Sequence, residues 1–339
     1  MPRESEIIAR IKARAGAASN NVLAGIGDDG AVLKQTVRSN LIMCSDLSVE
    51  GIHFRRDWSD PFSIGHKALA ATISDIAAMG GIPRFALVSL ALPRETSSDF
   101  IDQLIEGLFS VAETYDVAIV GGDTSSSPGP LFIDTILAGE CDENSAVLRS
   151  RAETADIIYV TGSLGASAVG LKLLEQERPN HPDHESAAGR RLAEQRASAI
   201  KRHILPEPRV KAGAAIGRAG LVSAMIDISD GLSTDLKNLT EASGCGAVLE
   251  ARTIPIAECA KLLAGELGDL DPLAIALQSG EEYELLFTSS ATNRRKIEIL
   301  FDELEVPISA IGRISQQKGL FLDDGKLIDL PIAGWEHFV

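Results

Sequence analysis

Strand-like apolar runs alternate with helical runs along the whole of this chain of 339 residues. The strands expected in the first half lie at 41–46, 85–93, 117–123 and 131–140, and the helices at 61–79 and 97–115. The alternation resumes near residue 157 and continues to the end of the sequence. This pattern is typical of α/β and α+β proteins, and it excludes a β-sandwich or a helical bundle.

The chain is also longer than one ordinary domain, which holds about 100–200 residues. A polar tract at 141–156 interrupts the rhythm of apolar runs and is the expected linker. The sequence therefore predicts an α/β (α+β) protein of two domains, 1–140 and 150–339.

The chain is acidic, because 48 Asp and Glu against 32 Lys and Arg give a net charge of −16. Such a chain repels nucleic-acid phosphates and anionic lipid headgroups, so we expect neither as a partner. Its longest apolar runs, such as 85–93, are less than half as long as the roughly 18–20 residues of a membrane-spanning helix. The four cysteines form no C-x-x-C pair, which predicts a reduced, cytoplasmic protein.

Aspartates adjoin apolar or glycine-rich segments in five places, most of them at an expected strand end or turn: Asp28 and Asp29, Asp46, Asp75, Asp123, and Asp227 with Asp230. Taken singly, each is as well explained as a turn former or helix cap. Carboxylates gathered in one cleft repel one another unless cations neutralise them, and hard oxygen ligands favour Mg²⁺. We therefore expect a site with several Mg²⁺ ions for a phosphorylated ligand.

The glycine pattern "GIGDDG" at 25–30 has the G-x-G-x-x-G spacing of dinucleotide-binding folds. The context argues against that function, because a strand, a turn and a strand are expected where the dinucleotide motif opens a helix. No G-x-x-x-x-G-K-[ST] occurs, so phosphates need other partners. Gly121 and Gly122 before Asp123 are candidates, as are the amides of "TGSLGAS" at 161–167; a tight strand-to-helix turn explains either equally well.

Two further side chains are candidate ligand contacts. His53 follows Asp46 in an expected loop, where it can contact a phosphate or simply be solvated. Trp335 can stack on a flat aromatic ligand or close a core. The residues alone leave both alternatives open.

Six ordered motifs carry a resemblance to a known family: "GIGDDGAVL", "SDLSVEGIHF", "HKALAATISDIAAMGGIP", "GGDTSS", "DISDGLSTDL" and "SGEEYELLFT". In this order they resemble thiamine-monophosphate kinases, which belong with the aminoimidazole-ribonucleotide synthetase-like ATP-binding proteins. The resemblance extends from near residue 6 to "GWEHF" at 334–338. It implies a two-domain fold of that type, each domain a mixed sheet with helices packed on it. It also implies transfer of the ATP γ-phosphoryl group to thiamine monophosphate (TMP).

The resemblance further implies cofactors, assembly and site residues. The first domain would bind ATP and metal and form a homodimer, the second would complete the active site, and the cofactors would be several Mg²⁺ ions and K⁺. Matched residue by residue, the resemblance implies eight metal ligands: Asp29, Cys44, Ser45, Asp46, Asp75, Asp123, Asp227 and Asp230. It implies ATP contacts at Gly121, Gly122, Asp123, Arg149 and Ser229, and TMP contacts at His53, Glu281 and Trp335. The implied catalytic residues are Asp46, Asp123 and Asp230. Cys44 departs from the family, which usually has serine there. A metal contact through the main-chain carbonyl would be unaffected, whereas one through the side chain would change.

The implied reaction needs no general base, because a phosphate oxygen with a second pKa near ~6 is largely ionised at neutral pH. It needs neutralisation and in-line alignment of two anions, which bridging metal ions supply. Two alternatives stay open: another ATP-using synthetase of the same superfamily, and a nucleotide- or dinucleotide-binding protein without turnover.

Overall fold

The structure of the protein is a computed structural model, which describes residues 4–15, 22–24, 32–33, 38–143, 145–176, 187–268 and 270–335. Its internal contacts divide the chain into two units. Unit 1 holds residues 1–77 and 81–144, and unit 2 holds residues 78–80 and 145–339. Asp28, Asp29 and the rest of the glycine pattern at 25–30 lie outside the described residues, so their predicted roles stay predictions.

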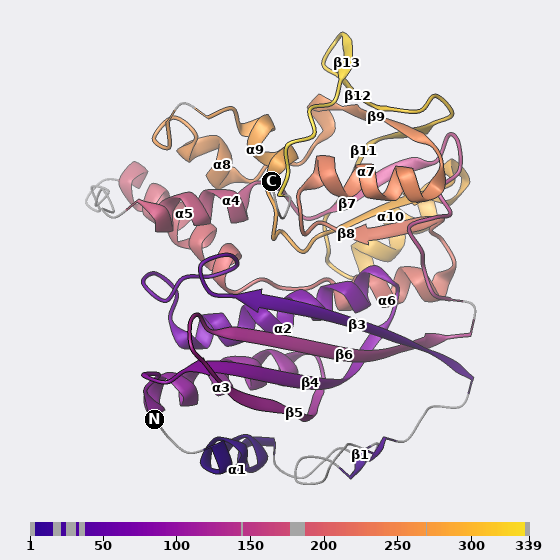
Figure 1. Cartoon of the computed structure of the whole chain (residues 1–339). Coiled ribbons are helices and arrows are strands. Elements are labelled where there is room, and N and C mark those ends of the chain that lie inside the picture. Colours follow the sequence, from indigo (N-terminus) through magenta and orange to yellow (C-terminus); the bar gives the residue numbers. More distant parts are fainter. Residues whose placement is uncertain are drawn as a thin grey trace. The chain divides into compact units, whose positions relative to one another are not determined.

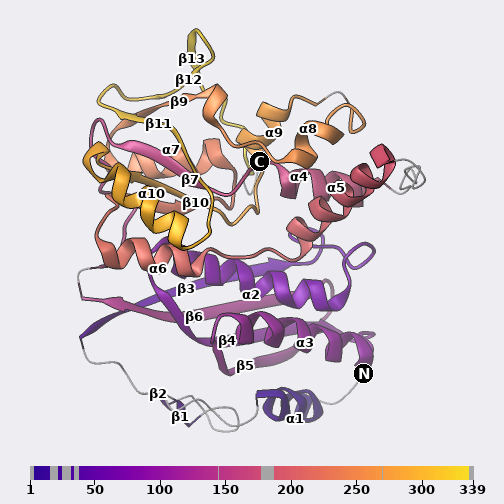
Figure 2. The same ribbon diagram turned by 180° about the vertical axis from the view of Figure 1, so that it is seen from behind.

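Unit 1 is built on a mixed four-stranded sheet. Its elements are α1 (Glu4–Ala15), β1 (Val22–Ala24), β2 (Val32–Leu33), β3 (Ser39–Val49), α2 (Pro61–Ala78), β4 (Ile82–Pro93), α3 (Ser98–Thr114), β5 (Ala118–Ser127) and β6 (Phe132–Asp142). The strand order is β3-β6-β4-β5; β4 and β5 are parallel, and the other pairs are antiparallel. Helices α2 and α3 cover one face of this sheet, and α1 lies beside α3 and the edge strand β5 (Figure 1 and Figure 2).

β3 and β5 are longer than the sequence predicted. The expected strands at 41–46 and 117–123 each ended at an aspartate, but both strands continue for several polar residues beyond it. Asp46 and Asp123 therefore lie within strands, and the expectation that they stand at strand ends is wrong. Both are edge strands, and an edge strand tolerates polar side chains. In the sequence alone, such a polar stretch looks like a turn that ends the strand.

The face of this sheet opposite α2 and α3 carries exposed apolar side chains. Leu41, Met43 and Leu47 of β3 are 60%, 63% and 48% exposed, and Leu87 of β4 is 37% exposed. They alternate with residues that point toward the helices, as the two-residue period of a strand requires. The apolar run at 41–46 therefore forms a strand with one covered and one exposed face.

Unit 2 is built on a mixed seven-stranded sheet with the order β13-β12-β9-β11-β7-β10-β8. Its elements are β7 (Ile157–Thr161), α4 (Ala166–Glu175), α5 (Ala187–Ile204), α6 (Val210–Ala219), β8 (Ala224–Asp227), α7 (Leu232–Ser243), β9 (Gly246–Glu250), η1 (Ala251–Thr253), α8 (Glu258–Leu263), α9 (Pro272–Gln278), β10 (Leu285–Ser289), η2 (Ala291–Asn293), α10 (Arg294–Glu303), β11 (Ile308–Ser315), β12 (Leu320–Asp323) and β13 (Leu327–Asp329).

Side chains of this sheet alternate between two cores. On one face, Val160 of β7 joins a core with Leu236 of α7. On the other face, Tyr159 stacks on Phe287 with 5.1 Å between ring centroids, and Phe287 stacks on Phe301 of α10 at 5.6 Å. A strand buried on both faces is apolar at every position, which explains the continuous apolar run at 157–160.

The architecture confirms the expected fold class, because each unit is a mixed sheet with helices packed on it. Within the described ranges, no helix has both the length and the apolar character needed to cross a membrane. All four cysteines are free thiols.

Candidate active site

In unit 1, three predicted metal ligands follow one another on β3 and alternate between the faces of the sheet. Cys44 and Asp46 lie on the face covered by α2, where the Cys44 thiol donates a hydrogen bond to the carbonyl of Thr72 at 3.4 Å. Asp46 pairs across the sheet with Thr135, whose hydroxyl contacts the Thr72 hydroxyl. Ser45 lies on the exposed face. Helix α2 thus packs on the side from which Asp46 projects.

Asp75 lies on α2, the helix that covers the face of the sheet to which Cys44 and Asp46 belong. It lies on that helix three residues after Thr72, which is nearly one turn, and it is half-buried. Unit 1 therefore brings three of the predicted metal ligands to its helix-covered face.

His53 lies in the turn that follows β3. The backbone N–H of Val49 donates to His53 Nδ1 at 3.0 Å, and Lys67 Nζ donates to the His53 carbonyl at 3.3 Å. Because Nδ1 accepts a hydrogen bond, the proton of the neutral ring lies on Nε2. In that tautomer Nε2 is a hydrogen-bond donor, the role that a phosphate contact requires.

Gly121, Gly122 and Asp123 lie side by side on β5. A Cβ placed on Gly122 would come within 1.7 Å of the Val88 carbonyl oxygen, so only glycine fits this close pairing of β4 and β5.

One row of paired residues across the sheet holds Asp46, Thr135, Val88 and Gly122, and the next row holds Leu47, Asp134, Ser89 and Asp123. Successive rows face opposite sides, so Asp123 projects from the exposed face. Within unit 1, Asp46 and Asp123 do not meet: they lie on opposite faces, three strand spacings or about 14 Å apart.

In unit 2, the "DISDG" segment forms a loop between β8 and α7 that folds around one buried carboxylate. The backbone N–H groups of Ser229, Asp230 and Gly231 donate to Asp235 Oδ2 at 3.1, 3.0 and 3.0 Å. Burial, together with the charges of Asp227 and Asp230, raises the pKa of Asp235 to about 8, against the opposing effect of these backbone hydrogen bonds. The sequence analysis missed Asp235, although an acid in the first turn of a helix is a common partner of the preceding amides.

The loop that carries Glu281 is joined to this first loop by backbone hydrogen bonds. The N–H of Glu281 donates to the Ser229 carbonyl at 2.7 Å, and the N–H of Tyr283 donates to the Ile228 carbonyl at 2.9 Å. Glu281 and Tyr283 have φ angles of 55° and 52°, in the left-handed region that non-glycine residues rarely adopt. Such strain concentrates at functional sites, which agrees with a binding role for Glu281.

The last described residue completes this group of loops. The N–H of Trp335 donates to the Asp230 carbonyl at 2.9 Å, and the Trp335 side chain is 52% exposed. The structure therefore brings together the backbones of Ser229, Asp230, Glu281 and Trp335, all four of which the sequence analysis selected. The alternative in which Trp335 closes a core is wrong, because half of its side chain faces solvent.

Arg149 lies at the other end of α7. Its carbonyl accepts a hydrogen bond from the Ser243 hydroxyl at 2.7 Å, and Ser243 is the last residue of that helix. Since α7 has 12 residues, the Arg149 backbone lies about 18 Å along the helix axis from the Ser229 loop. The structure does not bring the backbone of this predicted ATP contact to the loops around Asp230.

The amides of "TGSLGAS" bind an anion, but it is one of the protein's own side chains. The N–H groups of Gly165 and Ser167 donate to Glu282 Oε1 at 2.8 and 3.1 Å, and the Ser279 hydroxyl donates to it at 2.6 Å. Glu282 is 4% exposed, and burial raises its pKa. Of the two alternatives left open for this turn, the one in which these amides hold a ligand phosphate is therefore wrong.

Glu284 is the centre of a buried ion-pair network. Its carboxylate accepts hydrogen bonds from Arg209 Nε and Nη2 at 2.7 and 2.6 Å, from Arg202 Nη2 at 2.9 Å and from the Thr161 hydroxyl at 2.6 Å. Burial acts to raise the pKa of Glu284, but the hydrogen bonds and charges of the two arginines outweigh burial and hold that pKa below the ordinary range. The acids of "GEEYE" thus differ in position: Glu281 is partly exposed, whereas Glu282 and Glu284 anchor its loop.

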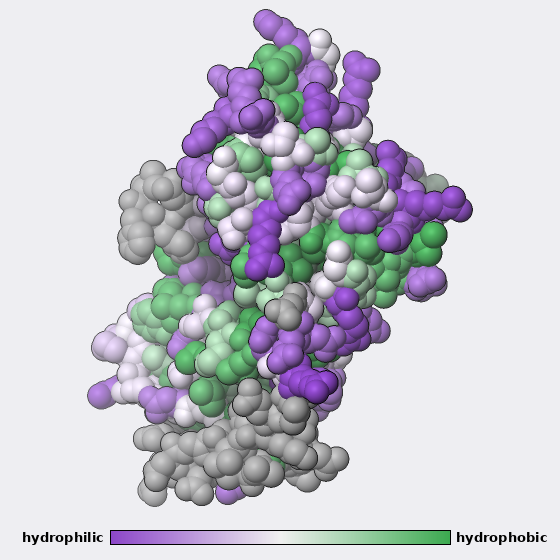
Figure 3. Space-filling model, turned by 90° about the vertical axis from the view of Figure 1, so that its right-hand side faces the viewer, coloured by the Kyte–Doolittle hydropathy of each residue, from purple (hydrophilic) through white to green (hydrophobic). Residues whose placement is uncertain are grey.

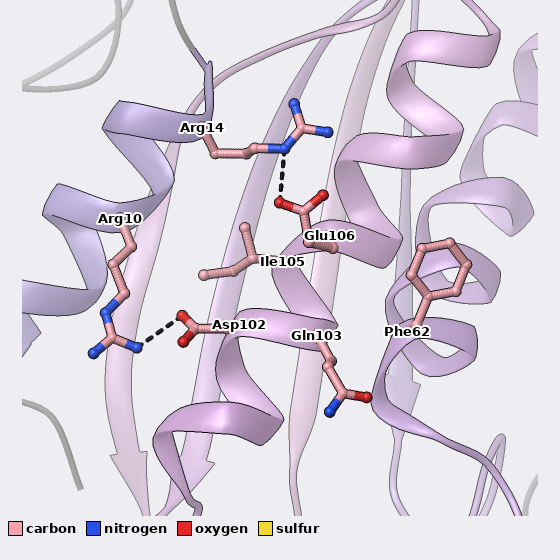
Figure 4. Close-up of a pocket in the computed structure, with 7 residues that line it drawn as sticks. All are labelled: Arg10, Arg14, Phe62, Asp102, Gln103, Ile105 and Glu106. Carbon is pink, nitrogen blue, oxygen red and sulfur yellow. Dashed lines mark hydrogen bonds and ion pairs between the residues drawn. The ribbon is translucent and has the colours of Figure 1, made fainter.

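A separate pocket of about 410 Å³ lies in unit 1 between α1, α2 and α3. Arg10 and Arg14 of α1 reach toward Asp102 and Glu106 of α3, and Phe62 lies across from them (Figure 4). The Arg10–Asp102 and Arg14–Glu106 ion pairs measure 2.7 and 2.9 Å. No residue that the sequence analysis selected lines this pocket.

Among the residues that the structure describes, no group of three or more His, Cys, Asp or Glu side chains is arranged to hold a metal ion. The predicted ligands are divided between the two units, and Asp29 is outside the described residues. Their convergence on shared ions therefore stays a prediction.

Comparison with known proteins identifies the family. Residues 27–141 match the model of the AIR synthase related protein N-terminal domain, and residues 154–325 match that of the C-terminal domain. The thiamine-monophosphate kinase of Salmonella typhimurium (strain LT2) is 35% identical over 337 residues, which cover 99% of this chain and 98% of that protein. The chain belongs to the thiamine-monophosphate kinase family. The resemblance that the six motifs indicated is confirmed.

Solved structures of thiamine-monophosphate kinases share this fold. A crystal structure of the enzyme from Stenotrophomonas maltophilia K279a is 35% identical, with a TM-score of 0.81, and the match covers 94% of this chain and 95% of that one. A structure described as AaThiL complexed with AMPPCP and TMP is 30% identical, with a TM-score of 0.77 and coverage of 100% and 99%.

Proposed function

We propose that this chain is an ATP-dependent thiamine-monophosphate kinase, which transfers the γ-phosphoryl group of ATP to TMP and forms thiamine diphosphate. The observation that carries the proposal is the meeting of Ser229, Asp230, Glu281 and Trp335 in unit 2. These four residues match ATP, metal and TMP contacts of the family, and they come from three segments far apart in the sequence. Family membership over nearly the whole chain supports the same activity.

TMP offers a thiazolium cation, an aminopyrimidine ring and a phosphate. We assign the partly exposed carboxylate of Glu281 to the cationic or amine part, because opposite charges attract most strongly where water is partly excluded. The exposed indole of Trp335 provides a flat surface for one of the rings. His53 Nε2 serves as a donor to the phosphate. The proposed ATP contacts are Gly121, Gly122, Asp123, Arg149 and Ser229.

The carboxylates of the "DISDG" loop are hard oxygen donors, the ligand type that Mg²⁺ prefers. Asp227 and Asp230 lie close enough to Asp235 to raise its pKa, so their charges are crowded, and a divalent cation relieves such crowding. The proposed ligands are Asp29, Cys44, Ser45, Asp46, Asp75, Asp123, Asp227 and Asp230. When bound, Mg²⁺ neutralises phosphate charge and so lets two anions approach. K⁺ is proposed from the family resemblance alone.

The reaction then needs little from the protein beyond position and charge. A terminal phosphate oxygen of TMP is already ionised, and it attacks the γ-phosphorus of ATP as the bond to ADP breaks. Asp46, Asp123 and Asp230 are the proposed catalytic residues, because they would hold the charges that the transition state requires. In this account unit 1 binds ATP and metal, and residues of unit 2 complete the active site.

The proposed assembly is a homodimer formed through unit 1. The exposed face of its sheet presents Leu41, Met43, Leu47 and Leu87, and contiguous apolar side chains of this kind mark association surfaces. Hydrophobic residues also reach the surface in the side view of Figure 3. The proposed location is the cytoplasm, which the four free thiols support.

Product analysis tests the proposed function. The chain is incubated with ATP, TMP and Mg²⁺, and thiamine diphosphate is measured by chromatography. We expect product only when all three are present, and we expect Asp230→Asn to lower kcat by about 100-fold or more. Asp302→Asn on the exposed surface of α10 is the matched control and should stay within about twofold of wild type. Absence of thiamine diphosphate, or another ATP-dependent product, would contradict the proposal.

A further inference from the structure

We propose that His203, which no sequence motif indicated, is a positioning residue for Glu281 and thereby sets the affinity for TMP. This inference rests on the proposed function of Glu281. His203 lies in the last turn of α5, and its ring Nδ1 is 3.5 Å from Glu281 Oε2. The side chain of His203 is 5% exposed and that of Glu281 is 26% exposed. The contact therefore links a buried ring to a carboxylate that reaches the surface.

The same ring nitrogen of His203 is also contacted from α4. The Ser167 hydroxyl lies 3.0 Å from His203 Nδ1, and Ser167 is 1% exposed. At Gly170, a Cβ would come within 2.2 Å of the Ala199 carbonyl oxygen, so α4 and α5 touch backbone to backbone beside this ring. A ring packed in this way has little rotational freedom, which makes it a rigid support for a carboxylate.

The end of α5 contacts all three acids of the "GEEYE" segment. Arg202 pairs with Glu284 at 2.9 Å and lies 3.7 Å from Glu282, while the next residue, His203, contacts Glu281. The arginine contacts hold the base of the loop. The His203 contact reaches Glu281, the acid that is proposed to bind TMP.

The surroundings of His203 explain why its effect should fall on Glu281. Glu281 contacts the ring from the loop, Arg202 precedes His203 on its own helix and pairs with Glu282, and Ser167 and Gly170 of α4 lie against His203. Glu282 Oε1 is already engaged by the amides of α4 and by Ser279. At 3.5 Å, the contact between His203 Nδ1 and Glu281 Oε2 is longer than a strong hydrogen bond, so it restricts the position of the carboxylate without holding it tightly.

Steady-state kinetics of the full chain test this role. His203→Leu removes the ring nitrogens, whereas His203→Asn keeps a polar nitrogen near the position of Nδ1. We expect His203→Leu to raise the KM for TMP about 10-fold with the KM for ATP within about twofold of wild type, and His203→Asn to recover most of that loss. Lys201→Leu, at an exposed position of the same helical turn, is the matched control and should change neither KM.

A double-mutant cycle with Glu281→Gln decides whether His203 acts through Glu281. We expect the double variant to raise the KM for TMP no more than the larger single effect, because both changes remove one interaction. Fully additive effects, an equal rise of both KM values, or a normal KM for TMP in His203→Leu would overturn the proposal.

If the proposed kinase function is wrong, the wild-type chain forms no thiamine diphosphate, which distinguishes that failure from a failure of the His203 proposal. The contact between His203 and Glu281 can then still be tested by the ¹⁵N resonance of His203 Nδ1 in the full chain. A change of this resonance in Glu281→Gln supports the positioning contact, and an unchanged resonance overturns it.

Discussion

Replacing Glu284 by glutamine tests the claim that a buried ion-pair network anchors the loop of Glu281. The substitution keeps the shape of the side chain but removes its charge. The carboxylate is 1% exposed and accepts four hydrogen bonds, three of them from Arg202 and Arg209 and one from Thr161. Glutamine has one acceptor oxygen, so its NH₂ group must face two of these donors whichever way the amide points.

The magnitude follows from the number of donors left without an acceptor. At least one arginine N–H loses a charge-assisted hydrogen bond, each worth about 1.5–3 kcal/mol, and a second donor is left facing the amide. Removing one partner of a buried ion pair costs about 3–5 kcal/mol. We therefore expect the free energy of unfolding to fall by about 4 kcal/mol, which corresponds to a Tm of unit 2 lower by about 8–16 °C.

Differential scanning calorimetry of the full chain measures this change, and hydrogen exchange of β10 against β6 shows whether unit 2 alone is affected. The control is Glu298→Gln, which breaks an exposed pair with Arg294 at 2.9 Å and should cost under about 0.5 kcal/mol. The folded-state pKa of Glu284 is lowered, so its stabilising effect is present above the ordinary glutamate pKa of about 4.3 and is lost as the pH falls below it. A Tm as high as that of the control, or a difference that grows in acid, would refute the reasoning.

Three further outcomes follow from the structure. Gly122→Ala should destabilise unit 1 by about 3 kcal/mol or more in urea unfolding, because the added Cβ would lie 1.7 Å from a carbonyl oxygen. Gly129→Ala is the control and should be near neutral, because the space around Gly129 is open. Equal losses of stability in the two variants would contradict the close-packing argument. Met43→Asp, on the exposed face of the unit 1 sheet, should shift the mass measured by light scattering from dimer to monomer. Leu327→Asp, at an exposed apolar position in unit 2, is the control and should leave the mass unchanged. An unchanged mass for Met43→Asp would exclude the exposed face of the unit 1 sheet as the dimer interface. Trp335→Ala should raise the KM for TMP about fivefold and more than the KM for ATP, and equal effects on both KM values would contradict the assignment of Trp335 to TMP.

The elements with a strong local signal were predictable from the sequence. The helix expected at 61–79 is α2 and ends one residue earlier, because a Pro start and a Gly-Gly end fix both boundaries. The strand before "SDG" is β8. The ends of β3 and β5 were not predictable, since the polar residues that continue them are stabilised by pairing with strands far away in the sequence.

The candidate site divides in the same way. Ser229, Asp230, Glu281 and Trp335 were found because each lies in a recognisable motif, and unit 2 brings their backbones together. The partners that hold them were missed, because nothing local marks a contact such as that of His203 with a loop some 80 residues later. For the same reason, the sequence did not reveal that the amides at 161–167 bind Glu282, which lies more than 110 residues later.

The central claim is that carboxylates of both units make a Mg²⁺-dependent receptor for phosphates. Isothermal titration calorimetry with AMPPCP, with and without Mg²⁺, tests it most directly. The account predicts binding only with Mg²⁺, weakened about tenfold or more by Asp123→Asn in unit 1 and by Asp230→Asn in unit 2. Equal affinity in the absence of Mg²⁺, or an affinity that neither substitution changes, would contradict it.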